Sequence, residues 1–140
     1  MPEKTTTDIN GEKMPEKNNN ALDELFVQEP EISKEILRDL LIKYVQLSDE
    51  GKIFTKPEFS SLSAKKQVLI ILLSKKVLKL KINLEEETTG ADIISLTGLA
   101  RGTVYPTLRD LEKDRLVASK EGKYWVPNYS ISNVKQLFSG

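Results

Sequence analysis

The segment 63–80, SAKKQVLIILLSKKVLKL, constrains the fold of this chain more than any other. Its centre, residues 68–73, is a run of six apolar side chains, and a helix that is apolar all round must be covered on every side. Six residues are too few to span a bilayer, which needs about 20. We therefore expect a buried central helix that begins after Ser63, a favourable N-cap residue. Its lysines are expected toward the helix ends: Lys65, Lys66, Lys75, Lys76 and Lys79.

Upstream of this segment, residues 31–47, EISKEILRDLLIKYVQL, carry apolar side chains at helical spacing. Ile36, Leu40 and Tyr44 belong to this stripe, which predicts an amphipathic helix packed on the core. Residues 48–51, SDEG, should end the helix. A short extended segment is expected next, bounded by Pro57, because proline is confined to the edges and ends of strands.

Downstream of the central segment, short elements follow one another closely. We expect, in order, a helix at 91–96 capped by Thr89, a turn at 97–99 containing Gly98, a helix at 101–114, a two-residue hairpin turn at Glu121-Gly122, and a helix at 130–138 capped by Ser130. Helix, glycine turn, helix and hairpin, in this order, are typical of a winged helix-turn-helix. The predicted fold is mainly α with a small β-hairpin wing: a winged helix-turn-helix with extra flanking helices.

Pro106 lies inside the second helix of this series, where proline removes one hydrogen bond and clashes with the preceding turn. If Thr103 is the N-cap, Pro106 falls in the first turn, whose N–H groups have no partner inside the helix. The cost of the proline then disappears, and the helix runs from about 103 to 114. On a helical wheel, Val104, Leu108 and Leu111 face the core.

The opposite side of the same wheel carries Pro106, Arg109 and Lys113. Two bases one helical turn apart are mildly destabilising by themselves. A phosphate backbone would offset that repulsion, and an arginine there can read guanine in the major groove. The alternative is a solvated surface on which Arg109 pairs with Glu112.

Residues 101–117, RGTVYPTLRDLEKDRLV, resemble the recognition helix of the PadR-type winged-helix repressors in the MarR-like superfamily. The matching residues are Gly102, Thr103, Val104, Tyr105, Pro106, Leu108, Leu111, Leu116 and Val117. The region from about 31 to 138 also resembles small archaeal winged-helix proteins. The resemblance implies DNA binding and transcriptional regulation by a homodimer. Two positions depart from it, because the family often has a capping residue such as Ser where Ala100 stands and usually has Gly where Arg115 stands.

We therefore predict sequence-specific binding of double-stranded DNA, with the helix at 103–114 in the major groove and a wing at 117–127. Lys120 and Lys123 bracket the hairpin turn and are placed at the tip of the wing; the alternative is a pair of solvated lysines that protect a strand edge. The full set of predicted DNA-binding residues is Arg101, Thr103, Tyr105, Pro106, Thr107, Arg109, Lys113, Lys120 and Lys123. The second candidate function is a winged-helix protein–protein module of a transcription or replication complex.

Composition argues against an enzyme. The chain has no cysteine, so it cannot form a thiolate metal site. It also has no histidine, which is the commonest metal ligand and the commonest general base. No catalytic pair or phosphate-binding loop is visible. The consecutive acids Glu85, Glu86 and Glu87 should point in different directions, which favours a solvated loop over a metal site. We expect no enzyme activity, no catalytic residues, no metal and no cofactor.

The N-terminal region differs in charge from the rest of the chain. Residues 1–30 contain seven acids and three lysines, a net charge of minus four, whereas the remaining residues contain 14 acids and 18 bases, a net charge of plus four. We expect residues 1–20 to be a disordered acidic tail and residues 21–30, which include ALDELFV, to be a linker or short docking segment. Residues 31–138 form the predicted domain. The N-terminus has no apolar signal region, so a cytoplasmic protein without membrane contact is expected.

Overall fold

The computed structural model describes residues 20–23, 25 and 34–139, and the chain divides into two units, 1–30 and 31–140. The first unit contains α1, Asn20–Asp23. The disorder predicted for residues 1–20 lies outside the described residues, except for Asn20, which begins α1. No helix in the described ranges is long and apolar enough to cross a membrane.

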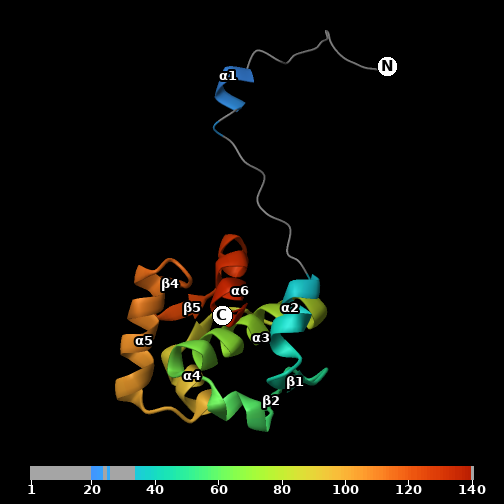
Figure 1. The fold of residues 1–140 in the computed structure, drawn as a ribbon, viewed down its shortest axis with the longest axis vertical. Helices are drawn as coiled ribbons and strands as arrows, with labels where there is room; N and C mark the ends of the chain where they lie inside the picture. The colour runs from blue at the N-terminus through green and yellow to red at the C-terminus, as the bar shows by residue number, and fades with distance from the viewer. Residues whose placement is uncertain (1–19, 24, 26–33, 140) are drawn as a thin grey trace. The chain divides into compact units, whose positions relative to one another are not determined.

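The second unit is mainly helical, with two small antiparallel sheets (Figure 1). This confirms the prediction of a mainly α fold with a small β component. In chain order the elements are α2 (Lys34–Leu41), β1 (Val45–Leu47), β2 (Ile53–Thr55), the 3-10 helix η3 (Pro57–Ser61), α3 (Ala64–Ile82), β3 (Thr88–Thr89), α4 (Gly90–Thr97), α5 (Arg101–Lys113), β4 (Ala118–Lys120), β5 (Lys123–Trp125), the 3-10 helix η4 (Asn128–Ser130) and α6 (Ile131–Ser139).

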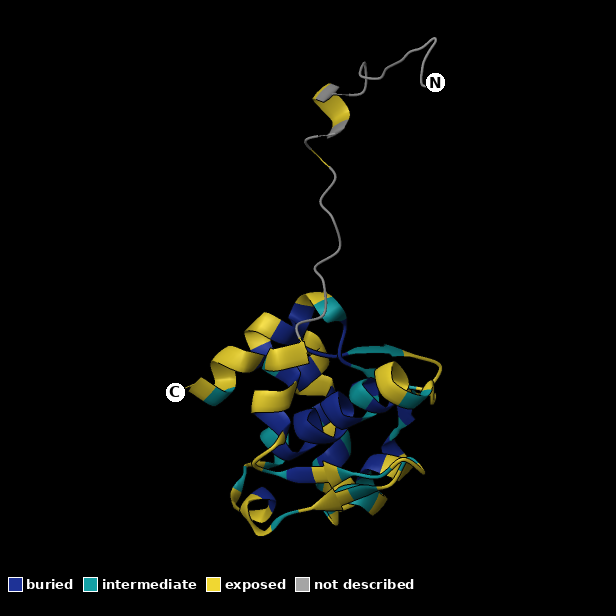
Figure 2. Ribbon diagram, turned by 90° about the vertical axis from the view of Figure 1, so that its right-hand side faces the viewer, coloured by how far each residue is buried: buried dark blue, intermediate teal, exposed yellow. Residues whose placement is uncertain are grey.

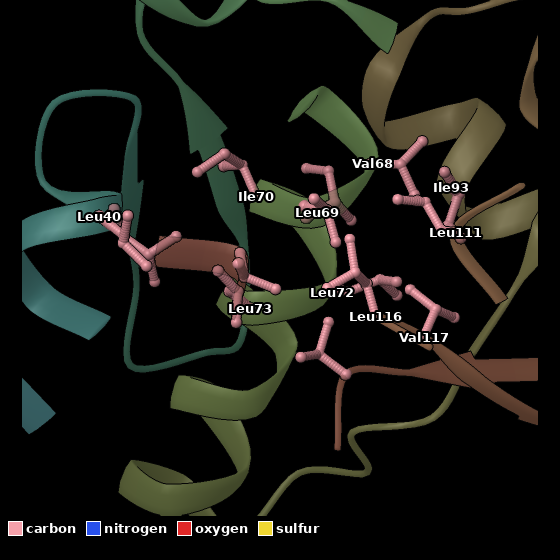
Figure 3. Packing of buried hydrophobic residues seen from close by; sticks show 14 of the residues in the cluster. Leu40, Val68, Leu69, Ile70, Leu72, Leu73, Ile93, Leu111, Leu116 and Val117 are labelled. Carbon is pink, nitrogen blue, oxygen red and sulfur yellow. The ribbon is translucent and has the colours of Figure 1, made fainter. Parts of the chain in front are cut away.

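Helix α3 is the buried centre of this unit, as its all-round apolar sequence predicts. The side chain of Ser63 accepts a hydrogen bond from the backbone N–H of Lys66 at 3.3 Å and caps the helix. Residues 68–73 are fully buried, and Figure 2 shows the buried residues gathered inside the unit. Figure 3 shows Leu69 and Leu72 of α3 among side chains of the surrounding elements. Helices α2, α4 and α5 and the strands β1 and β5 thus pack on one central helix.

The helix predicted over 31–47 is wrong in its second half. Helix α2 ends at Leu41, a turn follows, and β1 pairs with β2 in the register Val45↔Thr55 and Leu47↔Ile53. Val45 is buried and contributes to the core, whereas Gln46 is exposed, which is the two-residue alternation of a strand. Tyr44 and Val45 continue the helical spacing of the preceding apolar residues, so the local pattern favours a helix, but the pairing with β2 makes residues 45–47 a strand.

The second sheet contains the predicted hairpin, with strand order β3-β5-β4. Glu121 and Gly122 have φ values of 53° and 80°, and two consecutive left-handed residues form the turn that suits the twist of a two-residue hairpin. Strand β3 was not predicted. It is two residues long, and its hydrogen bonds to β5 depend on a partner more than 30 residues away in the chain.

Helix α6 follows η4 directly, with Ile131 and Val134 buried. The prediction that Ser130 caps α6 is wrong. Its hydroxyl donates a hydrogen bond of 2.8 Å to the carbonyl of Arg115, so it ties the start of α6 to the end of α5.

Arg115 has the left-handed conformation that the position requires, with φ of 63°. The N–H of Leu116 donates to the carbonyl of Leu111 at 2.9 Å, and the N–H of Arg115 donates to the carbonyl of Glu112 at 3.0 Å. This pair of bonds is the Schellman motif that ends many helices, usually with glycine at the left-handed position. An arginine there pays a steric penalty that glycine does not.

Arg115→Gly should therefore raise the free energy of unfolding by a few tenths to about 1 kcal/mol, measured by denaturant titration. Arg115→Ala is the control, because it removes the charge but keeps the Cβ atom and should give no gain. A loss of stability in Arg115→Gly would contradict this account of the turn.

Candidate nucleic-acid interface

The candidate interface is built on α4, a tight turn and α5. The hydroxyl of Thr89 accepts the N–H of Asp92 at 3.1 Å and caps α4, as predicted. Gly98 ends α4 with φ of 75° and donates its N–H to the carbonyl of Ile94. A residue with a Cβ atom is strained in that conformation, so this glycine allows the chain to turn sharply into α5.

The predicted start of α5 is wrong. Ala100, not Thr103, is the N-cap, and its carbonyl accepts the N–H groups of both Thr103 and Val104. Ala100 makes no side-chain cap. Half-buried Leu99 packs against the core just after the Gly98 turn, so tertiary contacts set the point at which the helix begins.

Pro106 consequently lies inside α5, in its second turn. The carbonyl that loses its helical donor is that of Gly102, four residues earlier. Gly102 is exposed, and a Cβ atom built there would meet nothing within 4 Å. The helix surface at Gly102 is thus open to solvent, and solvent-side carbonyls of a helix can tilt out toward water when the N–H is missing.

The inner face of α5 agrees with the helical wheel. Val104, Leu108 and Leu111 are each 0% exposed and pack in the core that α5 shares with α3 and α4. This stripe fixes the rotation of the helix about its axis. The residues on the opposite side therefore have a defined orientation toward solvent.

The outer face carries Pro106, Arg109 and Lys113, all exposed as predicted. The alternative in which Arg109 pairs with Glu112 is not observed, because the Glu112 carboxylate accepts a 2.6 Å hydrogen bond from Ser119 of β4. Across residues 34–139, neither Arg109 nor Lys113 forms an ion pair. Both cations remain available to a ligand.

The acidic residues of α5 reduce the positive charge of this surface. Asp110 and Glu112 are exposed on the same helix as the two free cations. Asp114, the next residue after α5, lies 3.6 Å from the ammonium of Lys65, so its charge is partly balanced from α3. The face is only mildly basic.

Tyr105 links the start of α5 to the start of α4. Its ring lies under the guanidinium of exposed Arg101, which is 4.8 Å from the ring centroid, a cation–π geometry. The ring also covers Gly90, where a Cβ atom would be 2.5 Å from ring atoms. Gly90 was not predicted to matter, since nothing in the local sequence indicates that an aromatic ring 15 residues later lies against it.

Thr103 and Thr107 are half-buried along the same helix. The hydroxyl of Thr107 donates to the carbonyl of Thr103 at 2.7 Å. Its donor is therefore used inside the helix, and its oxygen can still accept. Of the nine predicted DNA-binding residues, the seven on α5 are thus brought onto one helix.

The hairpin lysines differ from each other. Lys120 is exposed and makes no ion pair with any described residue, whereas the ammonium of Lys123 lies 3.2 Å from the carboxylate of Glu85. The hydrogen bond to Glu85 and the negative charge of that residue raise the pKa of Lys123 above its ordinary value of 10.5. Any stability from this pair is present below pH 10.5 and is lost as the pH rises through the raised pKa. The charge of Lys123 is partly neutralised at the place where the wing was expected to bind DNA.

The loop after α3 is not simply solvated, contrary to the prediction. The carboxylate of Glu86 lies 2.6 Å from the ammonium of Lys76, whose side chain is only 4% exposed. The contact is a close ion pair rather than a well-directed hydrogen bond. The Lys76 ammonium also donates to the side-chain oxygen of Asn128 at 2.8 Å. This cluster joins α3, the loop and η4. It was missed because Lys76 was expected toward a helix end and the loop acids were expected to be solvated.

No known protein family, curated protein or solved structure was found to match this chain.

Proposed function

We propose that residues 31–138 are a winged helix-turn-helix domain that binds double-stranded DNA sequence-specifically and regulates transcription. In this proposal α5 enters the major groove, and the hairpin of β4 and β5 is the wing that contacts the backbone or the minor groove. The order of α4, the Gly98 turn, α5 and the hairpin supports it.

The outer face of α5 is the observation that carries the proposal. Arg109 and Lys113 are exposed opposite a fully buried stripe, and no carboxylate within the described residues pairs with either of them. Placing two unpaired cations one turn apart costs a little stability without a ligand. Phosphate contacts by Lys113 and a guanine contact by Arg109 would account for them.

The remaining residues have supporting roles in this proposal. Arg101, held over Tyr105, would contact phosphate at the start of α5, together with the half-buried hydroxyl of Thr103. The hydrogen bond from Ser119 to Glu112 ties the hairpin to α5, so the helix and the wing would meet the duplex together. Free Lys120 would provide the main wing contact, and Lys123 a weaker one because of Glu85. The active species is proposed to be a homodimer.

The second candidate is a winged-helix module that binds another protein. The exposed acids Asp110 and Glu112, and the neutralisation of Lys123 by Glu85, favour it because they lower the positive potential of the surface. The two candidates differ in salt dependence. Affinity for DNA should fall steeply with salt as counterions are released.

Fluorescence anisotropy with random duplex DNA should detect binding at about 50 mM salt and a strong decrease by about 200 mM. Enrichment of bound fragments from a random pool would then identify a preferred site. No binding at the lower salt concentration would reject the DNA-binding proposal and favour the protein–protein module.

Arg109→Ala and Lys113→Ala should separate base recognition from phosphate contact. Lys113→Ala should weaken all duplexes about equally and lower the slope of log affinity against log salt by about one. Arg109→Ala should also relax the preference at one base pair, by about 1–3 kcal/mol. Lys135→Ala is a matched control, because it removes an exposed lysine from α6. Equal losses in the control and in the α5 variants would mean that only net charge matters.

A further inference from the structure

A second surface of the unit 31–140 is not used by the proposed DNA interface. A groove of about 420 Å³ lies between α2, β1 and the C-terminal half of α3, and none of its lining residues belongs to α5 or to the hairpin. Its apolar lining includes Leu37, Leu41 and Val77. At its edges, Ile42 is 59% exposed and Leu80 is 45% exposed. Exposed aliphatic side chains beside an apolar groove are a common mark of an interaction site.

The charged side chains that line the groove are all basic: Lys34, Arg38 and Lys81. Arg38 pairs with its neighbour Asp39 at 3.1 Å, while Lys34 and Lys81 form no ion pair within residues 34–139. An occupant that is both apolar and acidic would therefore bury aliphatic surface and balance free positive charge at the same time.

The N-terminal unit carries a segment of that kind. Residues 21–27, ALDELFV, combine hydrophobic residues with Asp23 and Glu24, and they lie in the part of the chain with a net charge of minus four. Helix α1 begins this segment, and Leu22 and Leu25 are 61% and 77% exposed. Helix α1 ends at Asp23 and Leu25 follows it, so the two leucines share one face when the helix continues for another turn in the complex.

We propose that the groove of one chain binds the acidic segment 21–27 of a second copy of the chain. Leu22 and Leu25 enter the groove as the apolar anchors, and the acidic side chains of the segment lie near Lys34 and Lys81. This is the helix-in-groove mode of recognition, in which a short amphipathic helix presents spaced apolar residues. When both chains donate a segment, the second contact forms within an existing complex and strengthens the dimer.

The first test is direct binding of a fluorescent peptide with the sequence of residues 19–29. The protein is the full chain with Leu22→Glu and Leu25→Glu, so that its own segments do not compete. Anisotropy should show saturable binding, and Leu80→Glu in the groove should weaken it by roughly tenfold or more. Phe54→Glu is the matched control, because Phe54 is 53% exposed on β2 outside the groove, and binding should be unchanged. Thermal unfolding of each variant reports whether the fold is retained.

The second test is the oligomeric state of the full chain by sedimentation equilibrium. We expect a concentration-dependent dimer that is lost in the Leu22→Glu, Leu25→Glu variant and in Leu80→Glu, and kept in Phe54→Glu. The proposal is overturned if the peptide does not bind, or if Leu80→Glu leaves its affinity unchanged. It is also overturned if the dimer persists both in the Leu22→Glu, Leu25→Glu variant and in Leu80→Glu. A wild-type chain that stays monomeric, yet binds peptide once its own leucines are replaced, also overturns it, because the segment then occupies the groove of its own chain. Neither test uses DNA, so their outcome is independent of the proposed DNA binding.

Discussion

Glu86→Gln should lower the free energy of unfolding by about 3–5 kcal/mol, although the substitution barely changes the shape of the side chain. The ammonium of Lys76, in a side chain only 4% exposed, would lose the one counter-charge that the described residues give it and keep the neutral oxygen of Asn128. A buried charge that is left unpaired costs far more than an exposed ion pair contributes. Urea denaturation at neutral pH measures the loss.

Glu85→Gln is the matched control for this prediction. It makes the same chemical change one residue earlier and breaks the ion pair between Glu85 and Lys123. Both side chains of that pair are exposed, 61% for Glu85 and 43% for Lys123. Exposed pairs contribute little to stability because solvent screens them, so this variant should stay close to the wild type. Equal effects of the two substitutions would mean that water reaches the Lys76 ammonium and that the cluster does not fix the loop. Lys76→Met combined with Glu86→Gln should recover part of the loss, because no unpaired charge remains.

Leu108→Ala should cost roughly 2–5 kcal/mol of stability, by the loss of buried aliphatic surface and the cavity left behind. Leu108 is 0% exposed at the contact of α5 with the core, where its neighbours cannot easily collapse into the space. Arg109→Ala, the next residue along the chain, should change stability by less than about 0.5 kcal/mol because its side chain is exposed and unpaired. Thermal and urea denaturation of the two variants under identical conditions provide the comparison.

This contrast also tests the orientation of α5. If Leu108 is a core residue and Arg109 is a ligand-binding residue, DNA affinity per folded molecule should fall in Arg109→Ala and not in Leu108→Ala. The reverse pattern, with Arg109→Ala unfolding the protein and binding unchanged per folded molecule, would show that the binding face of the helix is misassigned.

The local features of the chain were predictable because their causes lie within a few residues. The apolar run at 68–73 requires a covered helix, Ser63 and Thr89 supply cap oxygens at the correct offset, and Glu121-Gly122 permits two left-handed residues in succession. The spacing of Val104, Leu108 and Leu111 likewise determines which side of α5 is exposed.

Features that depend on distant segments were not predictable in the same way. Residues 45–47 form a strand because β2 offers them hydrogen bonds, and α5 begins at Arg101 because the turn and the core hold Leu99 in place. The partners of the loop acids are also set by the fold, since 38 positions separate Glu85 from Lys123 in the chain.

The sequence by itself determined the central helix, the Ser63 and Thr89 caps, the hairpin turn and the exposed cations of α5, since backbone preferences and apolar periodicity act over short distances. Only the tertiary structure decided which charges are free. It buries Lys76 against Glu86, joins Lys123 to Glu85, and leaves Arg109, Lys113 and Lys120 unpaired within the described residues. The physical reason is that an ion pair requires two side chains within about 4 Å. That proximity comes from the path of the whole chain and from no local pattern.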